Sequence, residues 1–360
     1  MRIRTPSHSL LVLACALALG TSACSSGTSG QAQPVSAHRA DLLNAPITGF
    51  GGYFASGPVT DVRADWQVPQ ITDGSSDAHA STWIGVQDPE GDFIQIGTTE
   101  DESSGIRRYT AFWSDPVVGF HPQFILAVRP GDEVSARLAK DPEGWTGTIQ
   151  DRTTGSTVRV PSSVHYARAA AMQRSEWVQE DPATQGGTVD LPYPLMTPVT
   201  FSALEVDGKV PDLTHDEGTA LASPNGEVLV PSAVRDDSFT MERGTPAQGR
   251  YLGDVGALDS AFNRFSDSRV VGSGTTAAHG TELMTAIVAF DRRVLMQEWS
   301  AGTRADIQKL VTHNQVLLDD LHAWERSGED GTLLARFSAD AKRDPQLSNP
   351  IRADLGLPPI

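Results

Sequence analysis

The sequence predicts a mainly β protein, an antiparallel β-sandwich followed by a C-terminal α-helical bundle. Two observations carry this prediction. Between about residues 48 and 242, short apolar or alternating runs are separated by clusters of Gly, Pro, Asp and Ser, which is typical of many short strands joined by turns. From about Gly249 the apolar spacing changes from two residues to three and four, which indicates amphipathic helices.

The expected strands follow one another at short intervals. They cover residues 62–68, 81–86, 93–97, 108–113, 123–128, 134–139, 145–151, 156–160, 175–180 and 198–206. Turn-forming residues separate several of them, as in Arg129-Pro130-Gly131-Asp132 and Thr154-Gly155. No stretch of this region has a convincing helical period, so we expect a sandwich or barrel over residues 47–243 and not βαβ units.

The second region has the apolar period of about four antiparallel helices over residues 249–343. Their apolar positions are Leu258, Ala261, Phe262 and Phe265, then Leu283, Ile287, Phe290, Val294 and Leu295, then Ile307, Leu310, Leu317, Leu321 and Trp324, then Leu333, Leu334 and Phe337. We expect an interaction or spacer module without a cofactor. The tail, residues 344–360, is rich in Pro and is expected to be irregular.

The N-terminus reads as a lipoprotein signal peptide over residues 1–24. Arg2 and Arg4 precede an apolar run, residues 10–19, that is too short to span a bilayer. Thr21-Ser22-Ala23-Cys24 then resembles a lipobox, which predicts lipidation of Cys24. Residues 25–46, rich in Ser and Gly at their start, suit a flexible linker. We therefore expect export, with a lipid anchor on the outer face of the cell membrane, or secretion after cleavage of an ordinary signal peptide.

Composition excludes several function classes. The formal net charge of −17 argues against nucleic acid as a partner. Both cysteines lie within residues 1–24, which excludes a thiol protease and a Cys-ligated zinc site in the mature chain. The sequence contains neither H-E-x-x-H nor G-x-S-x-G, and no later stretch is long and apolar enough for a transmembrane helix. We expect no metal and no cofactor, and a lipid anchor as the one contact with a membrane.

Several segments of the β-region resemble motifs of the glutamic peptidase family, also called eqolisins, in the order in which that family has them. The resemblance covers roughly residues 48–242, and it rests on Phe50–Tyr53, Val62–Pro69, Ser81–Val86, Ile94–Thr98, Tyr109–Trp113, Val128–Asp132, Ser175–Glu180 and Asp236–Thr240. Each segment is weak alone, and together they form a specific pattern. The resemblance implies a concanavalin A-like sandwich and an endopeptidase that acts on protein or peptide substrates in acid.

The same resemblance implies a catalytic pair, Glu176 and Gln95. Peptide hydrolysis without a metal or covalent nucleophile needs a base that activates water and a donor that stabilises the oxyanion. A carboxylate and an amide supply these two groups. The residue after Glu176 is Trp177, which suggests an apolar wall beside the carboxyl. Substrate contacts are expected from the aromatic residues of the neighbouring strands, Trp83, Tyr109, Trp113 and Trp66.

Two positions depart from the family pattern. Ser114 and Gln87 stand where the family has acidic residues that tune the catalytic pair. The alternative is therefore a non-catalytic, lectin-like β-sandwich that binds peptide or glycan at the cell surface. Geometry discriminates between the two functions, because an enzyme requires that the Glu176 carboxyl and the Gln95 amide share one cleft.

Overall fold

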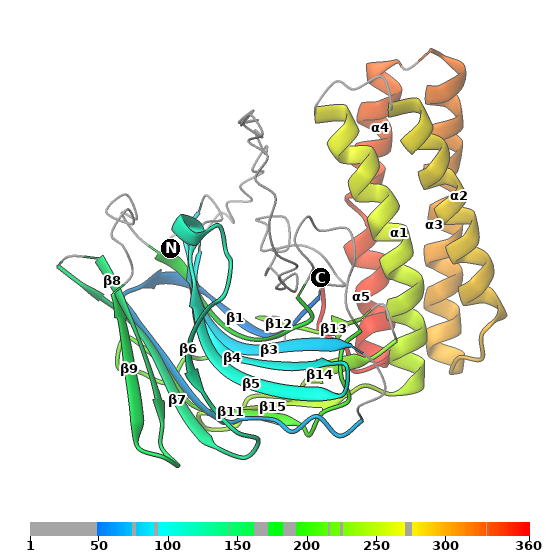
Figure 1. Ribbon diagram of the computed structural model, residues 1–360. Helices are drawn as coiled ribbons and strands as arrows, with labels where there is room; N and C mark the ends of the chain where they lie inside the picture. Colours follow the sequence, from blue (N-terminus) through cyan, green and yellow to red (C-terminus); the bar gives the residue numbers. More distant parts are fainter. Residues whose placement is uncertain are drawn as a thin grey trace, which may run out of the picture.

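The computed structural model describes residues 49–73, 77–89, 93–142, 144–161, 172–182, 192–214, 217–223, 226–270, 276–328 and 330–360 (Figure 1). Every strand pairing in it is antiparallel, and the strands form two sheets. All named strands precede the α-helices in the chain. The predicted order, sheets first and helices second, is therefore confirmed for the described residues.

The first sheet has seven strands in the order β12-β1-β10-β3-β4-β5-β6. Their bounds are β12 Gly218–Thr219, β1 Phe50–Val59, β10 Met172–Glu180, β3 Ala78–Gln87, β4 Phe93–Ser103, β5 Ile106–Ser114 and β6 Gln123–Ala127. Segments far apart in the sequence are neighbours in this sheet, because β10 lies between β1 and β3. This insertion places residues near 176 beside residues near 85.

The second sheet has eight strands in the order β13-β14-β15-β11-β2-β7-β8-β9. Their bounds are β13 Leu221–Ala222, β14 Val228–Pro231, β15 Phe239–Arg243, β11 Val199–Val206, β2 Asp61–Gln67, β7 Glu133–Asp141, β8 Gly144–Asp151 and β9 Ser156–Pro161. The sheets lie one over the other, and β3, β4 and β5 of the first sheet curve along their length (Figure 1).

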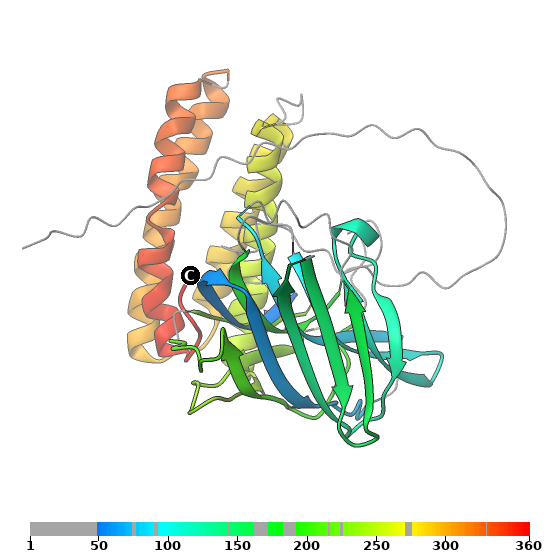
Figure 2. The same ribbon diagram turned by 90° about the vertical axis from the view of Figure 1, so that its left-hand side faces the viewer.

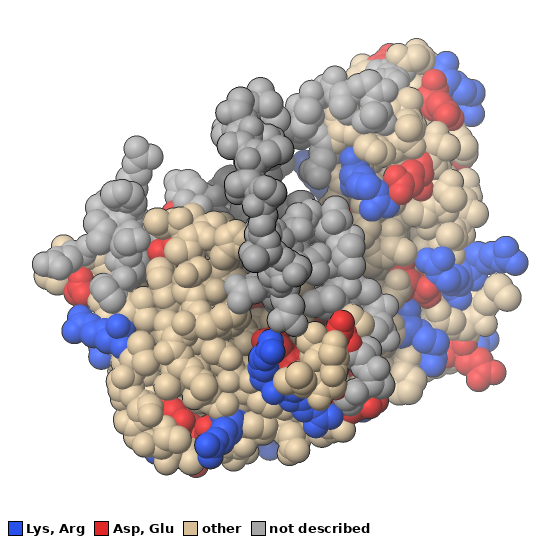
Figure 3. Space-filling model, viewed as in Figure 1, with Lys and Arg blue, Asp and Glu red and all other residues tan. Residues whose placement is uncertain are grey.

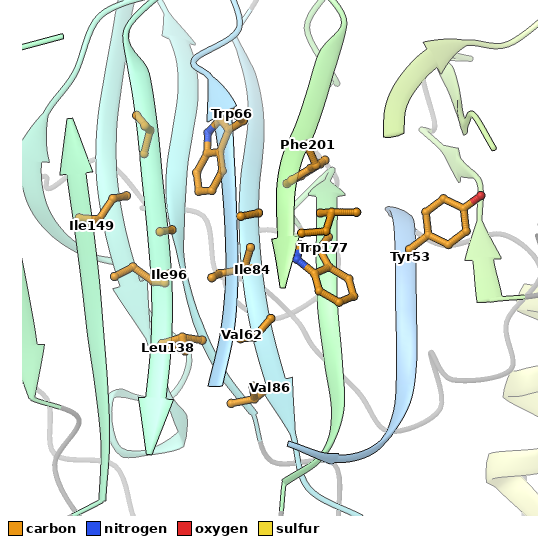
Figure 4. Close-up of a cluster of buried hydrophobic side chains, with 14 of the residues drawn as sticks. Tyr53, Val62, Trp66, Ile84, Val86, Ile96, Leu138, Ile149, Trp177 and Phe201 are labelled. Carbon is orange, nitrogen blue, oxygen red and sulfur yellow. The ribbon is translucent and has the colours of Figure 1, made fainter. Parts of the chain in front are cut away.

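The main core lies between the two sheets because alternate residues of their strands are apolar. Strand β2 shows the pattern most plainly, with Val62, Ala64 and Trp66 buried and their neighbours more exposed. Figure 4 shows inward side chains from both sheets, including Ile84, Ile96 and Trp177 of the first and Leu138, Ile149 and Phe201 of the second.

The C-terminal region contains five helices: α1 Pro246–Val270, α2 Thr276–Met296, α3 Ala301–Arg326, α4 Gly331–Ala341 and α5 Asp344–Asp354. They stand to one side of the sheets in Figure 1 and lie behind them in Figure 2. Most of the side chains predicted from the helical period form two clusters, but Leu295 was predicted wrongly, because it is 49% exposed. One contains Phe265, Leu283, Leu321 and Trp324, and the other contains Phe290, Ile307 and Leu310.

The prediction of an irregular tail was wrong, because residues 344–354 form α5. Pro345 lies in the first turn, where its missing N–H costs nothing. Pro350 lies inside the helix, where proline is unfavourable, but the following residues Ile351 and Arg352 are almost completely buried. Packing of this face offsets the local preference against a helix.

The helical region and the sheets share one apolar cluster. Val228 and Val230 of β14 belong to the same cluster as Tyr251 and Leu252 of α1 and Ile351 of α5. The Gln248 side chain adds a hydrogen bond from Nε2 to the Leu355 carbonyl oxygen at 2.8 Å. The two regions are therefore packed together through the second sheet, away from the outer face of the first.

Candidate active site

Glu176 and Gln95 lie on the two strands that flank β3. Glu176 of β10 pairs with Gly85 of β3, and Gly85 pairs with Gln95 of β4. Residues directly opposite each other in a sheet project to the same face, so both side chains extend from the face that turns away from the interlayer core. Two strand spacings separate their Cα atoms by about 10 Å. Both residues are completely buried.

Gly85 lies between the two residues and carries no side chain. A Cβ atom at this position would lie 3.3 Å from Glu176 Oε2 and 2.8 Å from a ring carbon of Trp83. The Glu176 carboxyl therefore reaches over the middle strand, in the direction of Gln95. A larger residue at position 85 would force the Trp83 ring away from the middle strand.

Ser114 holds the Gln95 amide in place. Ser114 of β5 is the cross-strand partner of Gln95, and Gln95 Nε2 donates a hydrogen bond to Ser114 Oγ at 2.7 Å. The amide nitrogen carries two hydrogens, so one remains for another acceptor. The Oε1 atom is buried and has no hydrogen-bond partner among the described residues. The residue that departs from the family pattern thus orients the predicted oxyanion donor.

Arg174, which no sequence motif indicated, brings a positive charge to the site. Its Nε lies 3.6 Å from Glu176 Oε1, and its guanidinium lies over the Phe54 ring at 4.0 Å. Burial lowers the pKa of Arg174 from its usual value, against the opposing effect of Glu176. The period of two would have placed Arg174 on the same face as Glu176, because the two residues are two apart in β10.

Aromatic side chains on the same face form the apolar surroundings of the site. Trp83, Phe50, Phe112 and Val178 are buried together in one cluster, with Phe54 packed against it. Trp83 also stacks on Phe93, and its Nε1 donates a hydrogen bond to Glu180 Oε2 at 2.8 Å. Of the four predicted aromatic contacts, Trp83 alone lies on the Glu176 face.

The other three predicted contacts, Tyr109, Trp113 and Trp66, face the interlayer core. Trp66 packs on Phe201 and donates to Thr98 Oγ1 at 3.2 Å, as its position in Figure 4 indicates. Tyr109 and Trp113 are packed against the same core, and the Tyr109 hydroxyl accepts a hydrogen bond from the Ile71 N–H. This placement does not support a role as cleft walls.

Strand alternation explains that correction. Trp113 and Tyr109 are odd-numbered in β5, whereas Ser114 and Phe112, which share a face with Gln95, are even-numbered. Trp177 likewise points into the core and donates to the Arg63 carbonyl oxygen, so it forms no wall beside Glu176. The period of two within each strand, applied from Glu176 and Gln95 outward, would have selected Phe112 and Phe54.

Other predictions concern metals, membranes and charge. The described residues contain no group of three or more His, Cys, Asp or Glu that could hold a metal ion, and no helix long and apolar enough to cross a membrane. Cys24 and the rest of the predicted signal peptide and linker lie outside the described residues. On the face shown in Figure 3, basic side chains lie beside acidic ones and do not gather in one patch.

The protein is thus a two-sheet antiparallel β protein with a buried carboxyl group and a buried amide group on one face of a sheet. The sequence model described as the peptidase A4 family matches residues 48–243. The chain therefore belongs to the peptidase A4 family of glutamic peptidases, or eqolisins. The match includes Glu176 and Gln95 and ends before α1, so the helices lie outside it.

Solved structures of eqolisins are similar to part of this chain. Scytalido-glutamic peptidase with a peptide-based transition state analog is 19% identical, covers 54% of this chain and 98% of its own, and has a TM-score of 0.45. SCP-B, a member of the eqolisin family in complex with the tripeptide Ala-Ile-His, is 19% identical, covers 54% of this chain and 98% of its own, and has a TM-score of 0.43. Aspergilloglutamic peptidase from Aspergillus niger is 19% identical, covers 46% of this chain and 99% of its own, and has a TM-score of 0.33. No curated protein matches the chain.

Proposed function

We propose that this protein is an acid-acting endopeptidase in which Glu176 is the general base and Gln95 the oxyanion donor. One observation carries the proposal. Glu176 and Gln95 pair with opposite sides of Gly85, so that a buried carboxyl and a buried amide extend from one face on either side of a residue that has no side chain. The family match supports a peptidase, and the resemblance to eqolisins supports a concanavalin A-like sandwich as its frame.

The proposed reaction uses one water molecule held between the two side chains. The Glu176 carboxylate accepts a proton from this water, and the resulting hydroxide adds to the carbonyl carbon of the peptide bond. The free N–H of the Gln95 amide donates to the oxygen on which negative charge develops. Glu176 then gives its proton to the leaving nitrogen, the C–N bond breaks, and an acid and an amine are released.

Arg174 supports the base in this scheme. A guanidinium 3.6 Å from a buried carboxylate stabilises its ionised form, which is the form that accepts a proton. The acidic side chains that the family has at the positions of Ser114 and Gln87 are replaced here by neutral groups. We infer that the balance of charge around Glu176 is set by Arg174 on its own strand.

Replacement of Arg174 by Met should move the pH profile of kcat/KM to higher pH. Without the positive charge, Glu176 keeps its proton to a higher pH. The rate should therefore rise at a higher pH, where the carboxylate forms. If the pair shares a proton, the rate should also fall at a higher pH, where that proton is lost. The measurement is the rate of cleavage of a fluorogenic peptide from pH 2 to 8. R174K, which retains a cation, should move the profile less.

The matched control for this prediction is Arg159→Met, which removes an exposed arginine from β9 of the second sheet. That variant should leave the profile in place. Identical profiles for Arg174→Met and the wild type would show that Arg174 does not act on the base.

The direct test of the proposed activity is digestion of a denatured protein by residues 25–360 between pH 2 and 7. We expect new termini inside the substrate, with no effect of reagents directed at serine, thiol or metal sites, because none of these groups takes part. Absence of cleavage at every pH would favour the alternative, a non-catalytic sandwich that binds peptide or glycan. That alternative draws on Ser114, which already occupies one hydrogen of the Gln95 amide.

We also propose that the protein is exported and lipid-anchored through Cys24. The observation behind this is the run of small residues before Cys24. An acyl chain contributes about 0.8 kcal/mol per buried methylene, and stable attachment needs more than one chain. Mass spectrometry of the protein from its native membrane should find a mature N-terminus at Cys24 with added lipid. An unmodified N-terminus, or one unrelated to Cys24, would contradict the anchor.

A further inference from the structure

The helical region contains a cavity of about 320 Å³ that plays no part in the proposed peptidase site. Its walls come from α1, α2, α3, α4 and the start of α5, and most of them are apolar, including Leu283, Ile287, Leu317 and Phe337. Small-molecule sites typically have volumes of about 300–1000 Å³ and are lined by apolar side chains with a few placed polar groups. The cavity has the size and lining of such a site at the small end of this range.

Two carboxyl groups from different helices line the cavity. Asp259 lies in α1, and Asp344 is the first residue of α5. The Oδ2 atom of Asp259 is buried and has no hydrogen-bond partner among the described residues. A buried acceptor without a donor is costly, and its presence in the wall of a cavity indicates a group that a ligand can satisfy.

Burial also raises the pKa of both carboxyl groups to about 7, although Arg352 opposes this for Asp259. The apolar wall disfavours their charged forms. A positive charge brought into the cavity would favour ionisation of both groups.

Other charged and polar groups lie near the cavity, and Ile360, the last residue of the sequence, also lines it. Arg352 of α5 is 1% exposed, and its Nε donates to the Pro358 carbonyl oxygen at 2.5 Å. His313 Nε2 of α3 lies 3.1 Å from Asp344 Oδ1 and 3.1 Å from the Asp340 carbonyl oxygen. Asn314 of α3, which lines the cavity, donates to Asp291 Oδ1 of α2 at 2.6 Å, and burial raises the pKa of Asp291 to about 6. No Lys or Arg lies among the described residues of the wall.

We propose that this cavity binds a small organic cation, an amine carried on an apolar body, with the amine at Asp259 and Asp344. The apolar body would contact Leu283, Ile287 and Phe337, and these contacts remove apolar surface from water without burying a polar group. An ammonium group supplies the donor that Asp259 Oδ2 lacks, and a charge-assisted hydrogen bond in an apolar wall is strong. A metal ion is a poorer occupant, because the described residues offer no group of three ligating side chains.

Phenethylamine and 2-phenylethanol test the proposal, because they share an apolar body and differ in charge. Titration calorimetry with residues 25–360 should show that the amine binds at least about tenfold more tightly than the alcohol at pH 8. The advantage should shrink at pH 5.5. Below pH 7 the raised pKa values keep the carboxyl groups neutral, so the amine has to displace their protons before it can pair with them. The tripeptide Phe-Gly-Gly, measured in parallel, separates a peptide amino terminus from a free amine as the source of this group.

Three variants locate the binding. Asp259→Asn should lower the affinity for the amine at least about tenfold and leave that for the alcohol unchanged. Ala341→Phe, which fills the cavity, should weaken both ligands. Asp319→Asn, at an exposed carboxyl of α3, should change neither. Asp344→Asn repeats the first test if Asp259→Asn does not fold, as judged by circular dichroism.

Equal affinities for the amine and the alcohol in the wild type, no binding of either, or undiminished amine binding by folded Asp259→Asn would overturn the proposal. Peptidase activity should be the same in all these variants. The two sites lie in different parts of the chain, so failure here and failure of the proposed peptidase function are distinguishable.

Discussion

Glu176→Gln should lower kcat on a peptide substrate by about 10⁴-fold, the upper end of what a positioned general base contributes. The substitution keeps the size of the side chain and removes its ability to take a proton. The Arg174 guanidinium lies 3.6 Å from Glu176, and a guanidinium cannot act as a base. In the proposed mechanism the attacking water then loses its proton acceptor, and KM should change far less than kcat.

Glu100→Gln provides a matched control. Glu100 lies on the neighbouring strand β4 and is as completely buried as Glu176, but it faces the interlayer core. Burial raises its pKa well above the usual value, and the Thr98 hydroxyl donates to it at 2.7 Å. A neutral carboxylic acid and an amide are close in shape, so Glu100→Gln should keep most of the activity. Wild-type turnover by Glu176→Gln would remove the proposed mechanism and favour the binding function.

The strand content could be predicted because the second sheet has one face in the core and a more exposed face. β2, for example, alternates buried and partly exposed residues along its whole length. β1 does not show such a pattern, since Gly51, Gly52, Gly57 and Pro58 interrupt it. The glycines of β1 are required by contacts with other strands. A Cβ at Gly52 would overlap the Trp177 carbonyl oxygen of β10, and the φ of Gly52 is 148°. Contacts between strands that are more than 100 residues apart, as β1 and β10 are, leave no periodic trace in either strand.

The candidate site could be named but not assembled from the sequence. Glu176 and Gln95 were found through motifs in a fixed order, and their placement on one face follows from the register with Gly85, which depends on how β10 enters the sheet. The aromatic surroundings were misjudged because residue type was weighed before strand parity. Trp113 and Phe112 are adjacent and equally apolar, and the pairing with Gln95 decides which of them faces the site.

Gln95→Ala should lower kcat by about 10²–10³-fold, the range measured when one oxyanion donor is removed. The amide carries no charge, so its loss leaves the base intact and removes stabilisation that is stronger in the transition state than in the bound substrate. KM should therefore change little. Stopped assays at saturating substrate separate this outcome from a general loss of binding.

Ser114→Ala distinguishes donation by Gln95 from its mere presence. The substitution removes the hydroxyl that accepts from Gln95 Nε2 at 2.7 Å and leaves the amide in place. If Ser114 orients the amide, kcat should fall by less than in Gln95→Ala, on the order of tenfold, because a donor that is present but loosely held still reaches the oxyanion. A double variant should then be no slower than Gln95→Ala alone, since Ser114 has nothing left to position. Additive losses would instead assign Ser114 a contact of its own with the substrate, and an unchanged kcat in Gln95→Ala would show that the oxyanion is stabilised elsewhere.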